Sequence, residues 1–372
     1  MKKFFFIAVA VVAMAACAKT EVNPVAENNA ISFQTATAVT KVTGSVFPQD
    51  QTFGVYAWTE GTTGEYFIEN KEVSYNATGN IWTTATPYYW PKNQTVDFFC
   101  YYPYNVAGTV PTVTKTQITY TDIDFTANQV DLMYADKAVG YTDNANQVED
   151  GQNAYEGVPT VFRHAGAKLK VNVILGENEK TEAVTGTKTR WSVVLKQVVL
   201  TGIYTKGTCV LNLSSTDNGI IPWTKPADAN GYYVWTPDAT LTNDEDNTLY
   251  KDVQNRNLVK GEGQMVIPEI YVLPQTLAAG QQKIALTVDI TTERQLPGET
   301  TWTTALVQTG KVVSANLLID TADPNTSVFA WQMNQAITYN ITLGPAGKQI
   351  TFDPAIIDWD PKTYSTNIDL DI

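Results

Sequence analysis

The chain contains a single histidine, His164, among its 372 residues. One histidine cannot build a His-rich zinc site, and a Ser/His/Asp triad would have to use His164 without the G-x-S-x-G elbow of many serine hydrolases. The sequence also lacks a Walker loop and a G-x-G-x-x-G run. It therefore predicts a protein that is not an enzyme and has no metal and no cofactor, with His164 as a structural residue at a strand start.

Charged residues are also scarce, at 17% of the chain, and the acidic excess gives a net charge of −13. Nucleic acid and anionic lipid headgroups are not attracted to such a chain, so no nucleic-acid partner is expected. Carboxylates are numerous enough for a glycosidase pair, but nothing distinguishes one pair from another. The acidic loops at Asp143–Asp150 and Asp244–Asp246 lack the spacing of a calcium loop and are interpreted as solvated loop charge.

Only three cysteines are present, and the first of them belongs to a processing signal. Lys2 and Lys3 precede an apolar run over residues 4–16, which is shorter than the roughly 20 residues that span a bilayer. The run ends in Met-Ala-Ala-Cys17, which is similar to a bacterial lipoprotein box. Residues 1–17 are thus predicted to be a signal peptide with lipidated Cys17, and residues 18–30 a polar tether. Ordinary cleavage near Ala16 is the alternative.

The other two cysteines, Cys100 and Cys209, lie in aromatic and strand-like runs. Both are expected to be buried free thiols, with a disulfide between them as the alternative. The surrounding stretch from Trp82 to Tyr104 is rich in aromatic rings. Such rings either fill a sandwich core or, when exposed, stack on sugars, and their alternation favours the core.

Short runs with a period of two residues replace helical periodicity throughout the chain. Lys168–Leu175, Ile284–Ile290 and Tyr339–Leu343 each place apolar side chains on one face, which is typical of half-buried antiparallel strands. Many short strands with polar turns predict an all-β sandwich. The polar stretch Tyr141–Gly157 suggests a domain boundary, with domains over residues 31–158 and 159–372.

The two ends of the mature chain carry further amphipathic strands. Ile31, Phe33 and Val39 share one face near the amino end, and Lys41 follows them. The last residues place Tyr364, Thr366, Ile368, Leu370 and Ile372 on one face, just after Pro361. A terminal strand of this kind can either close its own sheet or complete the sheet of a neighbouring subunit.

Several segments resemble the fimbrillin family, the type V pilus subunits among Bacteroidetes surface lipoproteins. In chain order they read FGVYAW, PYYWP, VDFFCYYPYN, DLMYADKAV, VFRHAGAKLKVNV, YVLPQTL, AITYNITLG and ITFDPAIIDWD. The similarity covers most of the mature chain, and it rests on the order and spacing of these segments together.

The resemblance implies two tandem transthyretin-like antiparallel β-sandwich domains and assembly by donor-strand exchange. Cleavage after a basic residue, here Lys41, would remove the strand that contains Ile31, Phe33 and Val39. Stalk subunits of the family typically carry Arg at this position, which leaves the protease unidentified. The donor strand that fills a neighbour's groove would carry Tyr364, Ile368, Leu370 and Ile372.

The function implied is that of a structural subunit of a cell-surface fimbria, with a role in adhesion. Its partners would be other fimbrial subunits, outer-membrane lipid through the acyl groups on Cys17, and glycans or proteins on host or bacterial surfaces. Asp320-Thr321-Ala322 resembles the O-glycosylation motif of these bacteria, with Thr321 as the acceptor. The alternative is a tip, an anchor or a glycan-binding surface lipoprotein of the same fold that does not polymerise.

Overall fold

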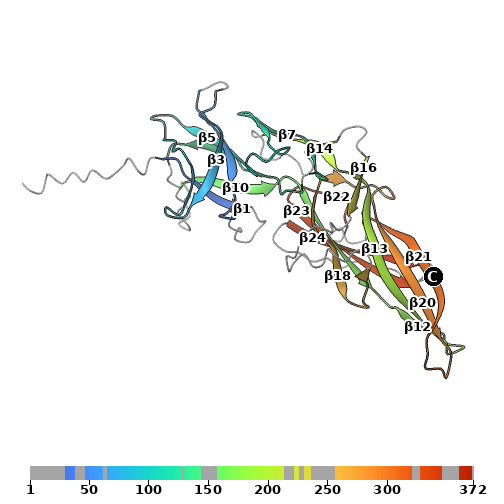
Figure 1. Ribbon diagram of the computed structural model, residues 1–372. Coiled ribbons are helices and arrows are strands. Elements are labelled where there is room, and N and C mark those ends of the chain that lie inside the picture. The colour runs from blue at the N-terminus through green and yellow to red at the C-terminus, as the bar shows by residue number, and fades with distance from the viewer. Residues whose placement is uncertain are drawn as a thin grey trace, which may run out of the picture.

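The computed structural model describes residues 30–37, 47–61, 65–127, 129–143, 157–212, 222–225, 230–235, 256–320, 327–345 and 360–370. Every regular element in these residues is a β-strand, which confirms the predicted all-β class. The strands form an elongated molecule with two lobes placed end to end (Figure 1). The amino-terminal strands build the first lobe, and the strands that follow β10 build most of the second.

The first lobe is built from one sheet that closes on itself. The strands follow the order β2-β3-β4-β1-β10-β8-β5-β9, and β2 also pairs with β5, which closes the ring. In this order the strands are β2 (Phe53–Thr59), β3 (Ile68–Asn76), β4 (Ile81–Thr84), β1 (Phe33–Thr37), β10 (Val158–His164), β8 (Met133–Ala135), β5 (Val96–Tyr102) and β9 (Ala138–Tyr141).

Aromatic side chains fill the interior of this closed sheet. Phe47 stacks on Phe162 with ring centroids 4.8 Å apart, and Phe53 meets both rings edge on. The predicted core position of the aromatic-rich stretch is confirmed for several of its members, none more than 6% exposed: Trp82, Trp90, Phe98, Phe99 and Tyr101. Tyr89 is the exception, with 53% of its surface exposed.

The second lobe packs two sheets face to face. One has the order β18-β11-β23-β24, and the other has the order β12-β13-β20-β21 with β16 and β17 added beside β13. The first comprises β18 (Gly263–Val272), β11 (Ala167–Leu175), β23 (Gln335–Pro345) and β24 (Asp360–Leu370). The second comprises β12 (Glu179–Thr181), β13 (Lys188–Tyr204), β20 (Lys283–Gln295), β21 (Thr303–Asn316), β16 (Asn230–Trp235) and β17 (Arg256–Asn257). A short pair, β19 (Gln275–Thr276) and β22 (Ala330–Trp331), lies beside them.

The predicted faces of these strands are confirmed. Each apolar residue of the three alternating runs is at most 2% exposed in the second-lobe core: Leu169, Val171, Val173, Leu175, Ile284, Leu286, Val288, Ile290, Tyr339, Ile341 and Leu343. The predicted antiparallel direction holds for β20, whereas β23 runs parallel to both β11 and β24. Side-chain alternation is the same in both directions, so it predicts the faces and not the direction.

A third sheet connects the two lobes, with the order β15-β14-β7-β6. Its strands are β15 (Trp223–Thr224), β14 (Lys206–Asn212), β7 (Gln117–Asp124) and β6 (Thr112–Val113), so residues from both sides of the predicted boundary pair here. β10, which begins at that boundary, pairs with β1 and β8 of the first lobe. The division at 158/159 into two domains stays a prediction.

Both remaining cysteines lie in the cores of the described structure. Cys100 of β5 and Cys209 of β14 are free thiols, 2% and 0% exposed. This confirms the buried-thiol interpretation and excludes a disulfide between them in this structure. Burial is the main cause that raises the pKa of both thiols well above the usual range.

Candidate functional site

The strand predicted to be released, β1, is held between two neighbours in the closed sheet. It pairs with β10 in parallel over five residues, from Phe33 opposite Val158 to Thr37 opposite Phe162. On its other side the contact with β4 is a single antiparallel pair, Phe33 opposite Trp82. β1 is therefore joined firmly to β10 and only briefly to β4.

Side chains of this segment reach into the core of the first lobe. Phe33 is 1% exposed, and its ring meets Phe53 and Phe98 edge on at centroid distances of 5.9 and 5.7 Å. Ile31 is 2% exposed, and its backbone N–H donates to the carbonyl of Tyr88 at 2.8 Å. Val39, the third predicted residue of this strand, lies outside the described residues.

The chain approaches β1 closely where β10 begins. Gly157 has a φ of +133°, and a Cβ there would lie 2.9 Å from the carbonyl oxygen of Ser32. The N–H of Val158 donates to that same oxygen at 2.8 Å. Any other residue at 157 would be strained and would push β1 away, so glycine is required where the chain approaches β1 this closely.

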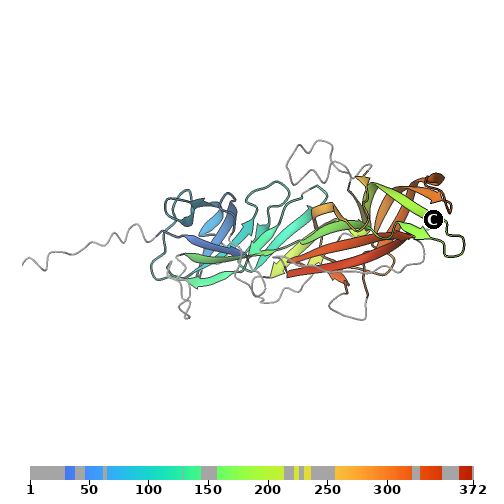
Figure 2. The same cartoon turned by 90° about the horizontal axis from the view of Figure 1, so that it is seen from below.

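The predicted donor strand corresponds to β24. Its backbone pairs in parallel with β23 over eleven positions, with Tyr364 opposite Tyr339 and Ile368 opposite Leu343. Figure 2 shows the two strands side by side along the second lobe. The terminal strand thus closes the chain's own sheet in this structure, and its role as a donor stays a prediction.

Other predicted site residues lie where the structure gives no description. Cys17, Lys41, Thr321 and Ile372 are all outside the described residues, so lipidation, cleavage and glycosylation at the first three stay predictions. Among the residues that the structure describes, no helix is long and apolar enough to cross a membrane.

His164 lies at the end of β10, where the chain passes from the first lobe to the second, and not at a strand start. The residue is 5% exposed, and Nδ1 lies 2.8 Å from Oδ1 of Asp131. The carbonyl of His164 accepts the backbone N–H of Asn334 at 3.1 Å. Asn334 directly precedes β23, so its contact joins the end of β10 to the second lobe, which agrees with a structural role for this histidine.

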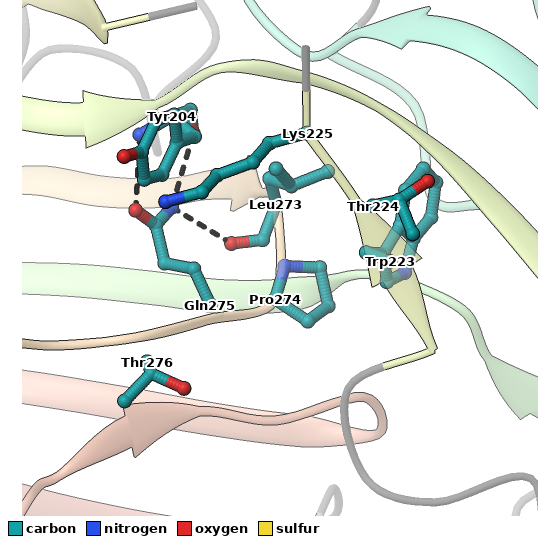
Figure 3. Close-up of a pocket in the computed structure, with 8 residues that line it drawn as sticks. All are labelled: Tyr204, Trp223, Thr224, Lys225, Leu273, Pro274, Gln275 and Thr276. Atoms are coloured by element: carbon teal, nitrogen blue, oxygen red, sulfur yellow. Dashed lines mark hydrogen bonds between the residues drawn. The ribbon is translucent and has the colours of Figure 1, made fainter. Parts of the chain in front are cut away.

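A hollow that the sequence did not predict lies between β13, β15 and the β18–β19 connection (Figure 3). Its volume is about 410 Å³. Leu273 and Pro274 are buried and supply apolar surface, while Thr224 and Thr276 supply exposed hydroxyl-bearing side chains. The lining comes from segments far apart in the chain, so no local motif could have indicated it.

One wall of the hollow pairs a lysine with an aromatic ring. Nζ of Lys225 lies 3.5 Å from the ring centroid of Tyr204. Gln275 holds the backbone of Tyr204 from below: Oε1 accepts its N–H at 2.9 Å, and Nε2 donates to its carbonyl at 3.0 Å. These bonds hold the backbone of Tyr204, and its ring and the ammonium group lie together at the edge of the hollow (Figure 3).

Comparisons with known proteins agree with the resemblance seen in the sequence. Residues 40–359 match the model of a protein family described as fimbrillin-like. The chain is similar to the solved structure of a candidate cell adhesion protein from Bacteroides uniformis, with 18% identity and a TM-score of 0.43, covering 85% of this chain and 93% of that one.

Two further solved structures are similar at lower identity. A candidate cell adhesion protein from Parabacteroides distasonis has 14% identity and a TM-score of 0.42, covering 91% of this chain and 99% of that one. A fimbrial protein from Bacteroides ovatus has 10% identity and a TM-score of 0.29, covering 93% of this chain and 51% of that one. Among curated proteins no match is found.

Proposed function

Because the chain belongs to the fimbrillin-like family, we propose that it is a structural subunit of a cell-surface fimbria that serves adhesion. The observation that supports this proposal best is the way in which β1 is held in the first lobe. A short strand carries Phe33 into the core of the first lobe, and it meets β4 through one residue pair. Such a strand can be exchanged for another without rebuilding the rest of the sheet.

In the proposed assembly, cleavage after Lys41 separates the segment that contains Ile31, Phe33 and Val39 from the rest of the chain. Its departure leaves the backbone groups of β10 without the partners that β1 supplies in five residue pairs. It also opens the apolar space that Phe33 occupies against Phe53 and Phe98. Unpaired strand edges and uncovered apolar surface both favour the addition of a new strand.

The incoming strand is proposed to be Tyr364–Ile372 of a neighbouring subunit, with Tyr364, Ile368, Leu370 and Ile372 facing the groove. To donate this strand, a subunit has to release β24 from its parallel pairing with β23. Donation thus exchanges one set of ladder hydrogen bonds for another. The gain comes from the apolar groove that cleavage opens, because burial of each large apolar side chain contributes about 1.5–3 kcal/mol.

The remaining parts of the proposal concern location and surface chemistry. Lipid attached to Cys17 would hold the exported precursor at the outer membrane, and the mature subunit would reside in the fimbrium. Thr321 would accept an O-linked glycan. A tip, an anchor or a glycan-binding adhesin that does not polymerise is the second candidate, and the hollow beside Lys225 is the observation that favours it.

The test is limited proteolysis of the purified mature chain with a trypsin-like protease, followed by mass spectrometry and SDS gels without boiling. We expect selective cleavage after Lys41 and then a ladder of SDS-resistant polymers. Lys41→Gln should prevent both, whereas Lys92→Gln, which changes an exposed lysine of the first lobe, should prevent neither.

The donor strand is tested separately. Ile368→Asp places a charge on the proposed groove face and should abolish polymers while cleavage continues, whereas Asp369→Asn on the opposite face should leave polymers intact. A chain that is cleaved after Lys41 and remains monomeric would contradict the stalk role. Polymers that persist after deletion of Tyr364–Ile372 would contradict the assignment of the donor.

A further inference from the structure

The hollow beside Tyr204 carries a positive charge that no carboxylate of the described residues neutralises. Nζ of Lys225 makes its contact with the face of the Tyr204 ring. Other lysines of the chain form ion pairs, among them Lys137 with Asp97 at 3.1 Å and Lys260 with Glu177 at 2.9 Å. A ring face attracts a cation without cancelling its charge, so Lys225 keeps its positive charge available to a ligand.

This charge is unusual in its surroundings, because the chain as a whole has a net charge of −13. A cation at the wall of a concave site with apolar surroundings acts more strongly on a ligand than one on an open surface. An acidic protein would repel an anionic ligand elsewhere. The hollow is therefore a place where this protein can select a negatively charged group.

The rest of the lining limits what else the ligand can carry. Gln275 is already committed, because Oε1 accepts from Tyr204 and Nε2 donates to the carbonyls of Tyr204 and Leu273. Thr224 Oγ1 donates to the carbonyl of Thr208 at 3.1 Å and can still accept a hydrogen bond. Together with the exposed side chain of Thr276 it remains as a partner for hydroxyl groups. Leu273 and Pro274, which are buried, line the hollow with apolar surface.

We propose that this hollow binds a single acidic sugar residue, such as a uronic acid. The carboxylate binds Nζ of Lys225, ring hydroxyls contact Thr224 and Thr276, and the apolar face of the sugar lies on Pro274. A volume of about 410 Å³ accommodates one such unit, and small-ligand sites commonly measure about 300–1,000 Å³. Tyr204 acts as a positioning residue that holds the ammonium group.

The proposal does not depend on strand exchange, so it is tested on the intact, uncleaved chain. Calorimetry and saturation-transfer NMR compare three probes: methyl β-D-glucuronide, methyl β-D-glucoside and sodium acetate. We expect the glucuronide to bind in the millimolar range and the other two probes to bind at least about tenfold more weakly. The glucoside lacks the carboxylate and loses the charge-assisted hydrogen bond to Lys225, and acetate loses the contacts of the sugar ring.

Three variants locate the binding. Lys225→Gln removes the charge and should weaken glucuronide binding by about tenfold or more, whereas Lys225→Arg should retain most of it. Thr276→Val should weaken glucuronide and leave acetate unchanged. Lys92→Gln, a change of one exposed lysine in the first lobe, is the matched control and should bind as the parent does. Urea unfolding confirms that each variant is folded.

Several results would overturn the proposal. Equal binding of glucuronide and glucoside would show that Lys225 does not select the ligand. Acetate binding as tightly as glucuronide would reduce the site to a simple anion contact. Absence of binding to all three probes, or glucuronide binding that is unchanged in Lys225→Gln, would show that the hollow is not a site for acidic sugars.

Discussion

The ring of Phe33 in β1 meets the ring of Phe98 in β5 edge to face, with centroids 5.7 Å apart and an interplanar angle of 87°. The two strands are not neighbours in the sheet, so this contact crosses the interior of the closed first lobe. β1 therefore contributes to the core as well as to the ladder of hydrogen bonds with β10.

The first prediction concerns that contact. Phe33→Ala should lower the free energy of unfolding by about 3–5 kcal/mol, because it removes a large ring and leaves a cavity. Urea unfolding of the uncleaved chain measures the change. Thr35→Ala alters a half-buried position of the same strand and should cost much less. Equal losses in the two variants would show that Phe33 has no special place in the core.

A second prediction concerns a buried hydrogen-bonded chain in the second lobe. Nε1 of Trp331 donates to the hydroxyl of Tyr339 at 2.9 Å, and that hydroxyl donates to the carbonyl of Leu317 at 2.9 Å. Tyr339→Phe leaves both buried partners unsatisfied, at a cost of about 1–3 kcal/mol for each group. Thermal unfolding should show a clear decrease, and Tyr89→Phe, at a 53% exposed tyrosine, should show almost none.

A substitution at Thr292 of β20, in contrast, should increase the free energy of unfolding. The residue is 6% exposed, and Oγ1 is buried without a hydrogen-bond partner in the part of the chain that the structure describes. Thr292→Val keeps the shape and removes the unsatisfied hydroxyl, so unfolding should require about 1 kcal/mol more. Thr291→Val, on the other face of β20, is the control. Destabilisation by Thr292→Val would indicate that a bound water satisfies the hydroxyl.

The buried thiols lead to a prediction about reactivity. Burial raises the pKa of Cys100 and Cys209, so almost no thiolate is present at neutral pH. In the folded protein neither Cys100 nor Cys209 should react with Ellman's reagent at pH 8, and both should react once urea unfolds the chain. Rapid reaction of either thiol under native conditions would contradict its burial.

Tyr134, a half-buried residue packed against the core, predicts a loss of stability at alkaline pH. Burial is the main cause that raises the pKa of Tyr134 to about 12, from an unfolded value of about 10. The folded state holds this proton more tightly, so its stabilising effect is complete below about pH 10 and is lost as the pH rises towards 12. Urea midpoints between pH 8 and 12 should decrease less steeply in Tyr134→Phe. A slope equal to that of the parent would exclude Tyr134 as a contributor.

Local patterns were sufficient for much of the fold. The alternation in Lys168–Leu175 determined which side chains of β11 are buried, because successive residues of a strand always point to opposite faces. The density of rings between Trp82 and Tyr104 determined a core position for most of them, since large apolar groups leave water wherever a sheet can cover them.

Tertiary structure alone decided the direction of β23 and the pairing of β7 with β14 across the predicted boundary. It also decided the hollow, which brings Tyr204, Lys225 and Leu273 together from segments far apart in the chain. Alternation is a local property of the backbone and is the same whichever strand lies alongside. The partner of each strand, and the side chains that meet at a site, depend on contacts between residues far apart in the chain.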